Sequence, residues 1–284
     1  MWSESLSRRG FIAGAAGATS VIALGATSTE SAAASIYGGY TAKVAKEIAI
    51  QLVSTAENST KSWAWSYDYI EDIGDGRGYT AGIVGWCSGT GDMLVLVRYY
   101  ALTSPGNVLQ RYLPALQRIM AAPYSSRPRL SHVLLGPAFT RAWASAAKTA
   151  QFRHAQRIER DRAYWNPALA LAKADGLSPL GLYIYYDISV NHGPGSDRES
   201  FGGIVAGVKA RGTRSPARAG NQITYLTSVV AARNAVLRGW GDYQANGRSS
   251  IVLKLLREKN LNLRTPLYWS FYGDSFSMTR PPVV

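Results

Sequence analysis

The sequence predicts an α+β protein, mainly α-helical, with one small antiparallel β-sheet. Apolar residues recur at helical spacing over most of the chain, as in the four-residue steps of Val44, Ile48 and Leu52. The glycine-rich run 74–78 is a natural chain reversal, so the strand predicted over 79–84 belongs to a small antiparallel sheet. About 250 residues remain after the N-terminal segment, which is enough for one domain with two lobes.

The N-terminal segment 1–34 predicts an export signal. Arg8 and Arg9 precede an apolar run rich in Gly and Ala, and residues 32–34 form a small-residue cleavage site. This pattern is typical of a bacterial twin-arginine signal peptide. A membrane anchor is disfavoured because the apolar run is short and interrupted by Gly, Ser and Thr. We therefore expect a secreted, extracellular protein whose mature domain, residues 35–284, does not enter a membrane.

Other segments follow helical spacing, with turns between them. An aromatic run that contains Trp63, Trp65, Tyr67 and Tyr69 alternates instead, which predicts an extended segment with one buried face. A loop rich in Ser, Arg and Pro is expected over 123–128. Helices are predicted over 92–101, 108–120, 139–165, 180–190, 223–237 and 250–258. The run 139–165 ends at Asn166-Pro167 and is long enough to bridge two lobes.

The segment 180–190 is apolar on nearly all sides, which predicts a buried central helix. Glycines after His192 suit a cap at its C-terminal end. Asp187 interrupts this helix, and a buried carboxylate is costly unless it is paired. We expect Arg233 and Arg248 to be its partners.

Two carboxylates lie in unlike settings within residues 56–92. Glu57 follows the first helical run, where the negative end of the helix dipole disfavours its anion. Partial burial by Trp63 or Trp65 would act in the same direction. Asp75 lies in the glycine-rich turn, where backbone N–H groups and Arg77 favour the charged form. Glycoside hydrolysis uses such a pair, one carboxyl protonated and one ionised. The alternatives are a solvated surface Glu57 and an Asp75 that only serves the turn.

Sequence blocks around these carboxylates resemble a known family. AENS, YIEDIGDGRGYT and CSGTGDM, in this order and spacing, are similar to the catalytic segment of bacterial secreted chitosanases of glycoside hydrolase family 46. Later blocks, YLPAL, ERDR, KADGL, YYD, HGPG and FGGI, resemble that family as well, so the resemblance runs from about residue 43 to about residue 274. It implies a lysozyme-like fold with a substrate cleft between two lobes. It also implies endo-acting hydrolysis of the β-1,4 linkages of chitosan with inversion.

The resemblance implies roles for individual residues. Glu57 would be the general acid and Asp75 the general base, with Thr80 orienting the attacking water. The other matches are an arginine beside the base, Arg77; positions at or near sugar subsites, Ser59, Trp63 and Asp92; and a charged network that supports the acid, Asp187, Arg233 and Arg248. Structural alternatives remain open: a strand Thr, a charge-balancing Arg, a capping Ser, a core Trp and a helix-start Asp.

The chain departs from the family pattern at one position. A glutamate is expected about seven residues beyond the arginine that Arg233 matches, but Trp240 stands there, and Asp242 is the nearest substitute. The departure leaves the catalytic pair intact. It affects how strongly this part of the chain binds a cationic sugar.

The formal net charge of +13 would repel a polycation such as chitosan, so the cleft must be locally acidic. The residues that can supply this charge are Glu57, Glu71, Asp72, Asp75, Asp92 and Asp187. Basic residues are expected on outer surfaces, where they would hold the protein on anionic cell walls or soil polymers: Arg127, Arg129, Lys209, Arg211, Arg214 and Arg218.

Two other functions remain open, a basic binder of polyanions or nucleic acid and a glycan-binding protein without catalysis. No nucleic-acid motif appears, and the glycine-rich segments lack the Gly-Lys-Ser/Thr ending of a phosphate-binding loop. His132, His154 and His192 are too scattered for a zinc motif, and the lone Cys87 excludes an intramolecular disulfide. We expect no metal, no cofactor, no nucleic-acid partner and a monomer.

Overall fold

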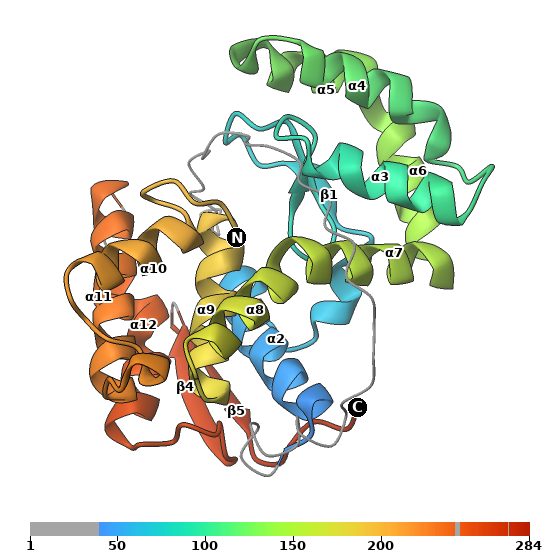
Figure 1. The fold of residues 1–284 in the computed structure, drawn as a ribbon. Coiled ribbons are helices and arrows are strands. Elements are labelled where there is room, and N and C mark those ends of the chain that lie inside the picture. Colours follow the sequence, from blue (N-terminus) through green and yellow to red (C-terminus); the bar gives the residue numbers. More distant parts are fainter. Residues whose placement is uncertain (1–39, 242–244, 272) are drawn as a thin grey trace. The chain divides into compact units, whose positions relative to one another are not determined.

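The computed structural model describes residues 40–241, 245–271 and 273–284, which divide into two compact units. Unit 1 contains residues 62–163. Unit 2 contains the described residues before 62 and after 163, so the chain leaves unit 2 once and returns to it (Figure 1). The predicted export signal over 1–34 lies outside the described residues.

Unit 2 is built around the helix α9 (Pro179–His192), almost all of which is buried. This confirms the buried central helix predicted from its apolar surface. Gly193, with φ of 77°, is its C-cap, as predicted. The helices that pack against α9 are α2 (Ala42–Asn58), α8 (Asn166–Ala174), α10 (Phe201–Ala210), α11 (Gln222–Gly239) and α12 (Ala245–Arg257).

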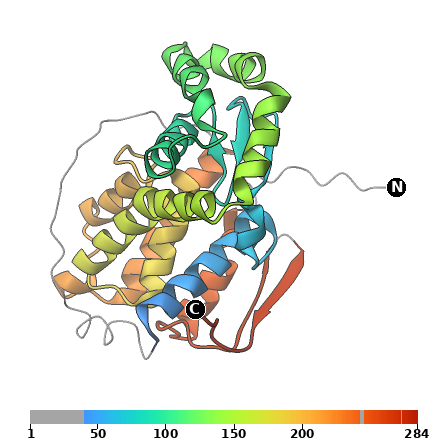
Figure 2. The same cartoon turned by 90° about the vertical axis from the view of Figure 1, so that its right-hand side faces the viewer.

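The helix α2 ends just after Glu57, as its sequence predicts. Thr41 is its N-cap, and the Thr41 hydroxyl accepts a hydrogen bond from the Val44 N–H at 3.2 Å. Ile48 and Leu52 are fully buried, and α2 packs against α9. The helix ends at Ser59, a C-cap in the left-handed region with φ of 50°. Figures 1 and 2 show α2 in blue beside α9 in yellow.

A hairpin near the C-terminus of unit 2 was not among the predicted elements. Strands β4 (Leu267–Phe271) and β5 (Asp274–Met278) pair antiparallel and are red in Figure 2. Side chains of β4 alternate between buried and exposed, and the buried Trp269 donates from Nε1 to the Thr55 hydroxyl of α2 at 3.0 Å. Trp269 therefore packs in the core and ties the hairpin to α2.

Unit 1 contains the predicted antiparallel sheet, with strand order β1-β2-β3. Its strands are β1 (Ile70–Asp72), β2 (Tyr79–Ala81) and β3 (Trp86–Cys87). The glycine-rich turn joins β1 to β2, and three of its glycines have φ between 74° and 77°. The predicted strand over 79–84 ends early, at Ala81, because Gly82 turns the chain with a φ of 72°.

Helices pack on this sheet around a core of large apolar side chains that includes Trp86, Phe139, Trp143 and Phe152. These helices are α3 (Asp92–Thr103), α4 (Leu113–Ala121), α5 (Arg127–Leu134), α6 (Gly136–Ala147) and α7 (Ala150–Arg160). The prediction of one long helix over 139–165 is wrong. The Thr149 hydroxyl caps α7 by accepting a hydrogen bond from the Phe152 N–H at 3.2 Å, and this cap separates α6 from α7.

Three shorter segments of unit 1 also differ from the prediction. The aromatic segment Trp63–Tyr67 is a 3-10 helix and not an extended strand. Residues expected as a loop form the 3-10 helix Tyr124–Ser126 and the start of α5, where proline in the first helical turn needs no N–H partner. The run predicted over 108–120 divides into the 3-10 helix Gln110–Tyr112 and α4.

Across the described ranges, no helix combines the length and the apolar character required to cross a lipid bilayer.

Candidate active site

Glu57 lies in the last turn of α2, as predicted, and about a fifth of its side chain (21%) is exposed. Its Oε1 forms an ion pair with Arg248 Nη2 of α12 at 2.6 Å. The helix-end argument considered only the dipole of α2. The structure adds a guanidinium from a distant part of the chain, which spacing within α2 cannot reveal.

Arg248 is held in turn by the buried carboxylate of Asp187 on α9. Asp187 Oδ1 accepts from Arg248 Nη2 at 2.8 Å, and Oδ2 accepts from Arg233 Nη2 at 3.3 Å. Burial acts to lower the pKa of Arg248, but the negative charges of Asp187 and Glu57 outweigh it and raise this pKa overall. Arg248 therefore stays charged between two carboxylates. The predicted pairing of Asp187 with both arginines is confirmed.

Asp75 lies in the glycine-rich turn of unit 1 and keeps 12% of its side chain exposed. Its Oδ1 accepts a hydrogen bond from the Arg77 backbone N–H at 3.0 Å. Its Oδ2 accepts from Arg77 Nε at 2.8 Å and forms a close ion pair with Nη2 of the same guanidinium. Turn and side chain together fix one carboxylate orientation, so the predicted place of Arg77 beside Asp75 is confirmed.

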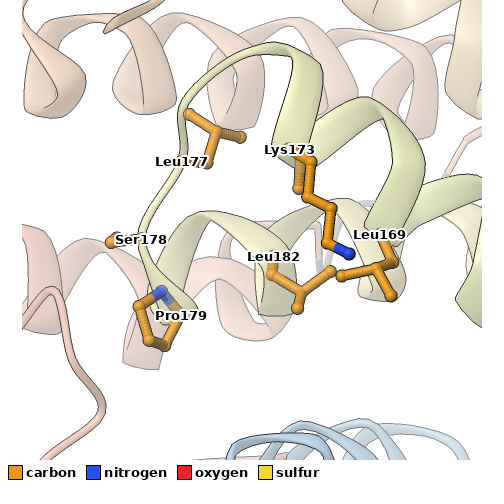
Figure 3. A pocket seen from close by; sticks show the side chains of 7 residues that line it. Leu169, Lys173, Leu177, Ser178, Pro179 and Leu182 are labelled. Atoms are coloured by element: carbon orange, nitrogen blue, oxygen red, sulfur yellow. The ribbon is translucent and has the colours of Figure 1, made fainter. Parts of the chain in front are cut away.

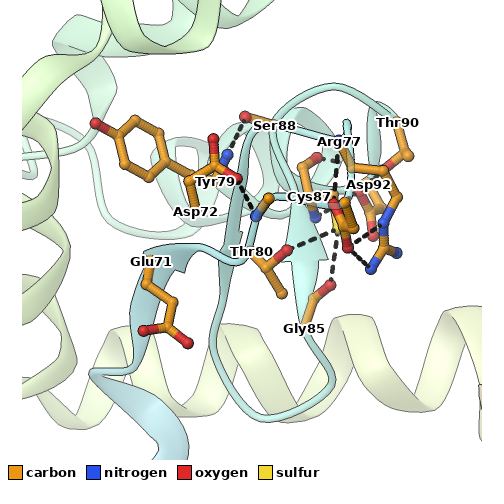
Figure 4. A network of polar contacts seen from close by, with 12 residues as sticks. Glu71, Asp72, Arg77, Tyr79, Thr80, Gly85, Cys87, Ser88, Thr90 and Asp92 are labelled. Atoms are coloured by element: carbon orange, nitrogen blue, oxygen red, sulfur yellow. Dashed lines mark hydrogen bonds and ion pairs between the residues drawn. The ribbon is translucent and has the colours of Figure 1, made fainter. Parts of the chain in front are cut away.

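Thr80 lies in β2, opposite Glu71 on one side and Cys87 on the other (Figure 4). Only 1% of the residue is exposed, and its hydroxyl is 3.4 Å from Cys87 Sγ. Cys87 also donates from Sγ to the Gly85 carbonyl at 3.2 Å. Burial raises the pKa of Cys87 to about 12, so the thiol is protonated at neutral pH, as expected of a buried structural cysteine. The water-orienting role of Thr80 stays a prediction.

Asp92 connects the end of β3 to the start of α3 (Figure 4). Its Oδ1 accepts from Cys87 N at 2.9 Å, Thr90 Oγ1 at 2.6 Å and Met93 N at 3.0 Å. Burial raises the pKa of this carboxyl, while these hydrogen bonds act in the opposite direction. The helix-start role is thus observed, and the sugar contact of Asp92 stays a prediction.

The other two positions matched to sugar subsites also have visible structural roles. Ser59 is the left-handed C-cap of α2. Trp63 meets Tyr67 edge to face at 6.0 Å, and the Arg160 guanidinium lies 5.1 Å from its ring centre. These are the cap and core roles that the sequence left open. Contacts of either residue with sugar stay predictions.

The structure thus brings the predicted residues together in two groups. On unit 2, Glu57, Arg248, Asp187 and Arg233 form one continuous charged network. On unit 1, the Asp75–Arg77 pair follows β1, and the chain continues into the strand that carries Thr80. Cys87, which contacts Thr80, was not predicted as a site residue. Sequence spacing gives no signal for that contact, because it depends on the register between β2 and β3.

Two basic residues expected on outer surfaces also have partners within the fold. Arg127 donates to the backbone carbonyls of Gly89, Met120 and Ala122 at 3.0 to 3.1 Å. Lys209 pairs with the buried carboxylate of Asp175 at 2.6 Å. Both side chains contribute to the fold. Arg127 is only partly exposed, whereas Lys209 is exposed, so its expected place on the surface is confirmed.

A small pocket in unit 2 lies between α8 and α9 (Figure 3). Its lining is mostly apolar, and Lys173 is the charged residue among those that line it. The lining residues are Leu169, Ala172, Lys173, Leu177, Ser178, Pro179 and Leu182. Because none of these lining residues is a carboxylate, the pocket is not the candidate active site.

A mainly helical fold that presents one carboxylate at a helix end and another in a glycine-rich turn has the acidic groups of a glycoside hydrolase. The family model agrees with this class and matches residues 51–267. The chain belongs to glycosyl hydrolase family 46.

Characterised relatives are similar over most of the chain. A chitosanase of Streptomyces sp. (strain N174) is 48% identical over 232 residues, which are 81% of each chain. A chitosanase of Nocardioides sp. (strain N106) is 47% identical over 82% of this chain and 81% of its own. A solved co-crystal structure of chitosanase OU01 with substrate is 45% identical, with a TM-score of 0.76 over 84% of this chain and 97% of that one.

Proposed function

We propose that this protein is an endo-acting chitosanase that hydrolyses the β-1,4 linkages of chitosan with inversion. Two kinds of observation support the proposal. The relatives of the same family are named chitosanases. The observation that carries it is that an arginine fixes each acidic side chain by an ion pair. Arg248 pairs with Glu57, and Arg77 pairs with Asp75.

In the proposed reaction, water adds to the anomeric carbon while the bond to the glycosidic oxygen breaks. Glu57 gives its proton to the leaving oxygen as general acid. Asp75 takes one proton from the attacking water as general base, and Thr80 orients that water. The products are two shorter chains, and Glu57 and Asp75 return to their starting forms by exchanging a proton with solvent.

Asp187 and Arg233 do not take part in proton transfer in this scheme. Asp187 holds Arg248, because an arginine buried to this degree needs a fixed anionic partner, and Arg233 pairs with the other oxygen of Asp187. Arg248 then fixes the direction in which the Glu57 carboxyl points. Arg77 does the same for Asp75.

Product analysis tests this function. Digestion of chitosan should lower its viscosity early, before many reducing ends accumulate, because an endo-acting enzyme cuts within the chain. Proton NMR of the first products should show the α-anomer at the new reducing end, since inversion of a β-linkage yields α. Initial β-anomer would contradict inversion, and unchanged chitosan would contradict the function.

We also propose that the protein is exported through its N-terminal segment and acts outside the cell as a monomer. The paired Arg8 and Arg9, followed by an apolar run and an alanine cleavage site, support export. Replacing both arginines by lysine should retain the protein in the producing cell. Equal amounts of both forms in the medium would refute a twin-arginine signal.

A further inference from the structure

Trp240 occupies the position where the family pattern has a glutamate. In the structure its side chain forms a hydrogen bond with a glutamate from another part of the chain, Glu199. Trp240 is the residue directly after α11, and its indole Nε1 donates to Glu199 Oε2 at 2.8 Å. Glu199 is exposed and lies in the loop between α9 and α10. A carboxylate, that of Glu199, is thus hydrogen-bonded to the Trp240 side chain, although residue 240 itself is not acidic.

The loop that carries Glu199 is fixed at several points. Asp197 Oδ1 accepts from the backbone N–H groups of Glu199 and Ser200, at 3.2 and 3.1 Å. The Phe201 N–H donates to the Gly193 carbonyl at 3.0 Å. The backbone of Glu199 is therefore held on one side and its carboxylate on the other, so little conformational freedom remains to be lost on binding.

His192 completes this cluster from the end of α9. Its Nδ1 donates to the Glu199 carbonyl at 3.0 Å, and its ring lies against the Trp240 ring with centres 4.8 Å apart. Burial, together with the charges of Arg233 and Arg248, lowers the pKa of His192 to about 3. The imidazole is therefore neutral at neutral pH, and it does not compete as a cation for Glu199.

The cluster shares both of its helices with the charged network of the acid. His192 is five residues after Asp187 on α9, and Trp240 is seven residues after Arg233 on α11, which correspond to about 8 and about 11 Å along the helix axes. Asp187 reaches Glu57 through Arg248. Glu199 thus lies on the same unit as the acid, at the C-terminal ends of two helices that carry its charged network.

We infer that Glu199, positioned by Trp240, binds the ammonium group of a glucosamine unit of the substrate. The inference rests on the proposed function, since chitosan supplies the cation. An ionised carboxylate in a fixed orientation is a suitable acceptor for an ammonium donor. An N-acetylated unit carries no charge at that nitrogen, so this contact favours deacetylated units.

Binding to a catalytically inactive background tests the inference. In a Glu57→Gln parent, adding Glu199→Gln should raise the Kd for a fully deacetylated glucosamine oligomer about three- to tenfold. Glutamine keeps an oxygen that can accept from the Trp240 indole, so the structural tie survives while the charge is lost. High salt should reduce the difference between the two proteins, because it screens the ammonium–carboxylate attraction.

Glu258→Gln is the matched control. Glu258 is also exposed, belongs to unit 2 and pairs loosely with Lys254 at 4.0 Å. This change removes the same charge and should leave Kd within about twofold. A Glu199→Gln protein that binds as tightly as its parent, or one that loses no more affinity than Glu258→Gln, would overturn the inference.

Failure of the inference is distinguishable from failure of the proposed function. With Glu57 intact, chitosan cleavage by the wild-type protein tests the function by itself. If the wild type cleaves chitosan and Glu199→Gln does not weaken binding, only the ammonium contact is wrong. If Glu199→Gln raises KM for deacetylated chitosan and changes kcat little, the contact is supported.

Discussion

At the scale of single residues, the arginine Arg248 determines how the proposed acid is presented. Its planar guanidinium has several donors in a fixed geometry, and it uses them on Glu57 of α2 and Asp187 of α9. Only 5% of the Arg248 side chain is exposed, so its charge depends on these carboxylates. Three helices are thereby joined at one ion-pair network.

His192 gives a pH-dependent stability prediction at the same scale. Its pKa is about 3 in the folded protein, against 6.5 for an ordinary histidine. Between these values the unfolded chain binds a proton that the folded protein does not, so stability falls as pH falls from about 6.5 towards about 3. His192→Asn keeps a donor for the Glu199 carbonyl and removes the titrating group.

The measurement is urea unfolding of both proteins at about pH 7 and about pH 4.5. The wild type should lose more stability between the two pH values than His192→Asn does. Comparing the change within each protein removes any general cost of the substitution. Equal losses in the two proteins would show that His192 is protonated in the folded state.

Many contacts of single site residues could be predicted from the sequence. The contacts that were missed share one physical reason. That Asp187 has cationic partners was predictable because burial of a carboxylate requires them, and the resemblance to the family indicated Arg233 and Arg248, which are 46 and 61 residues away. The Asp75–Arg77 pair was predictable because both lie in one short turn. The Glu57–Arg248 and Trp240–Glu199 contacts depend on which helices pack together, and no local pattern reports that.

At the scale of elements, glycine spacing shapes the sheet of unit 1. Gly82 ends β2 with φ of 72°, and a Cβ there would lie 2.6 Å from Gln156 Oε1 and 2.7 Å from the Trp86 ring. Gly74, in the turn before β2, has a similar φ of 74° but has nothing within 4 Å of an added Cβ. The two positions share backbone strain and differ in the space around them.

We predict that Gly82→Ala destabilises unit 1 by about 2–4 kcal/mol, since it adds overpacking to backbone strain. Gly74→Ala should cost about 1 kcal/mol, from backbone strain alone. Chemical denaturation of the two variants and the wild type gives both values. If the two substitutions cost the same, packing around Gly82 is not what requires glycine there.

The elements that the sequence predicts well are those with long apolar periodicity. The helices α2, α3, α9, α11 and α12 were all expected. The break between α6 and α7 was missed because a single capping hydroxyl, Thr149, interrupts a pattern that stays amphipathic on both sides. The β4–β5 hairpin was missed because Tyr268, an aromatic residue on the exposed face of β4, hides the apolar–polar alternation of that strand.

At the scale of the whole molecule, the net charge of +13 opposes a polycationic substrate and favours anionic surfaces. We expect Arg211, Arg214 and Arg218, which are exposed and close in sequence, to hold the protein on such surfaces. Lys209 is excluded from this group because it pairs with Asp175.

Replacing these three arginines by glutamine should lower the salt concentration at which the protein leaves an anionic resin. The matched control replaces the exposed Arg238, Arg257 and Arg280, which gives the same change in net charge from scattered positions. The control should elute at higher salt than the first variant. Identical elution would mean that net charge alone, and not this group, governs retention.

The central claim is that Glu57 and Asp75 perform the proton transfers, and turnover of their isosteric variants tests it most directly. Glu57→Gln and Asp75→Asn should each lower kcat on chitosan by about a hundredfold or more, since each removes one proton-transfer group. Thermal unfolding should stay cooperative in both, so the loss is not a loss of fold. Near-normal turnover in either folded variant would contradict the account.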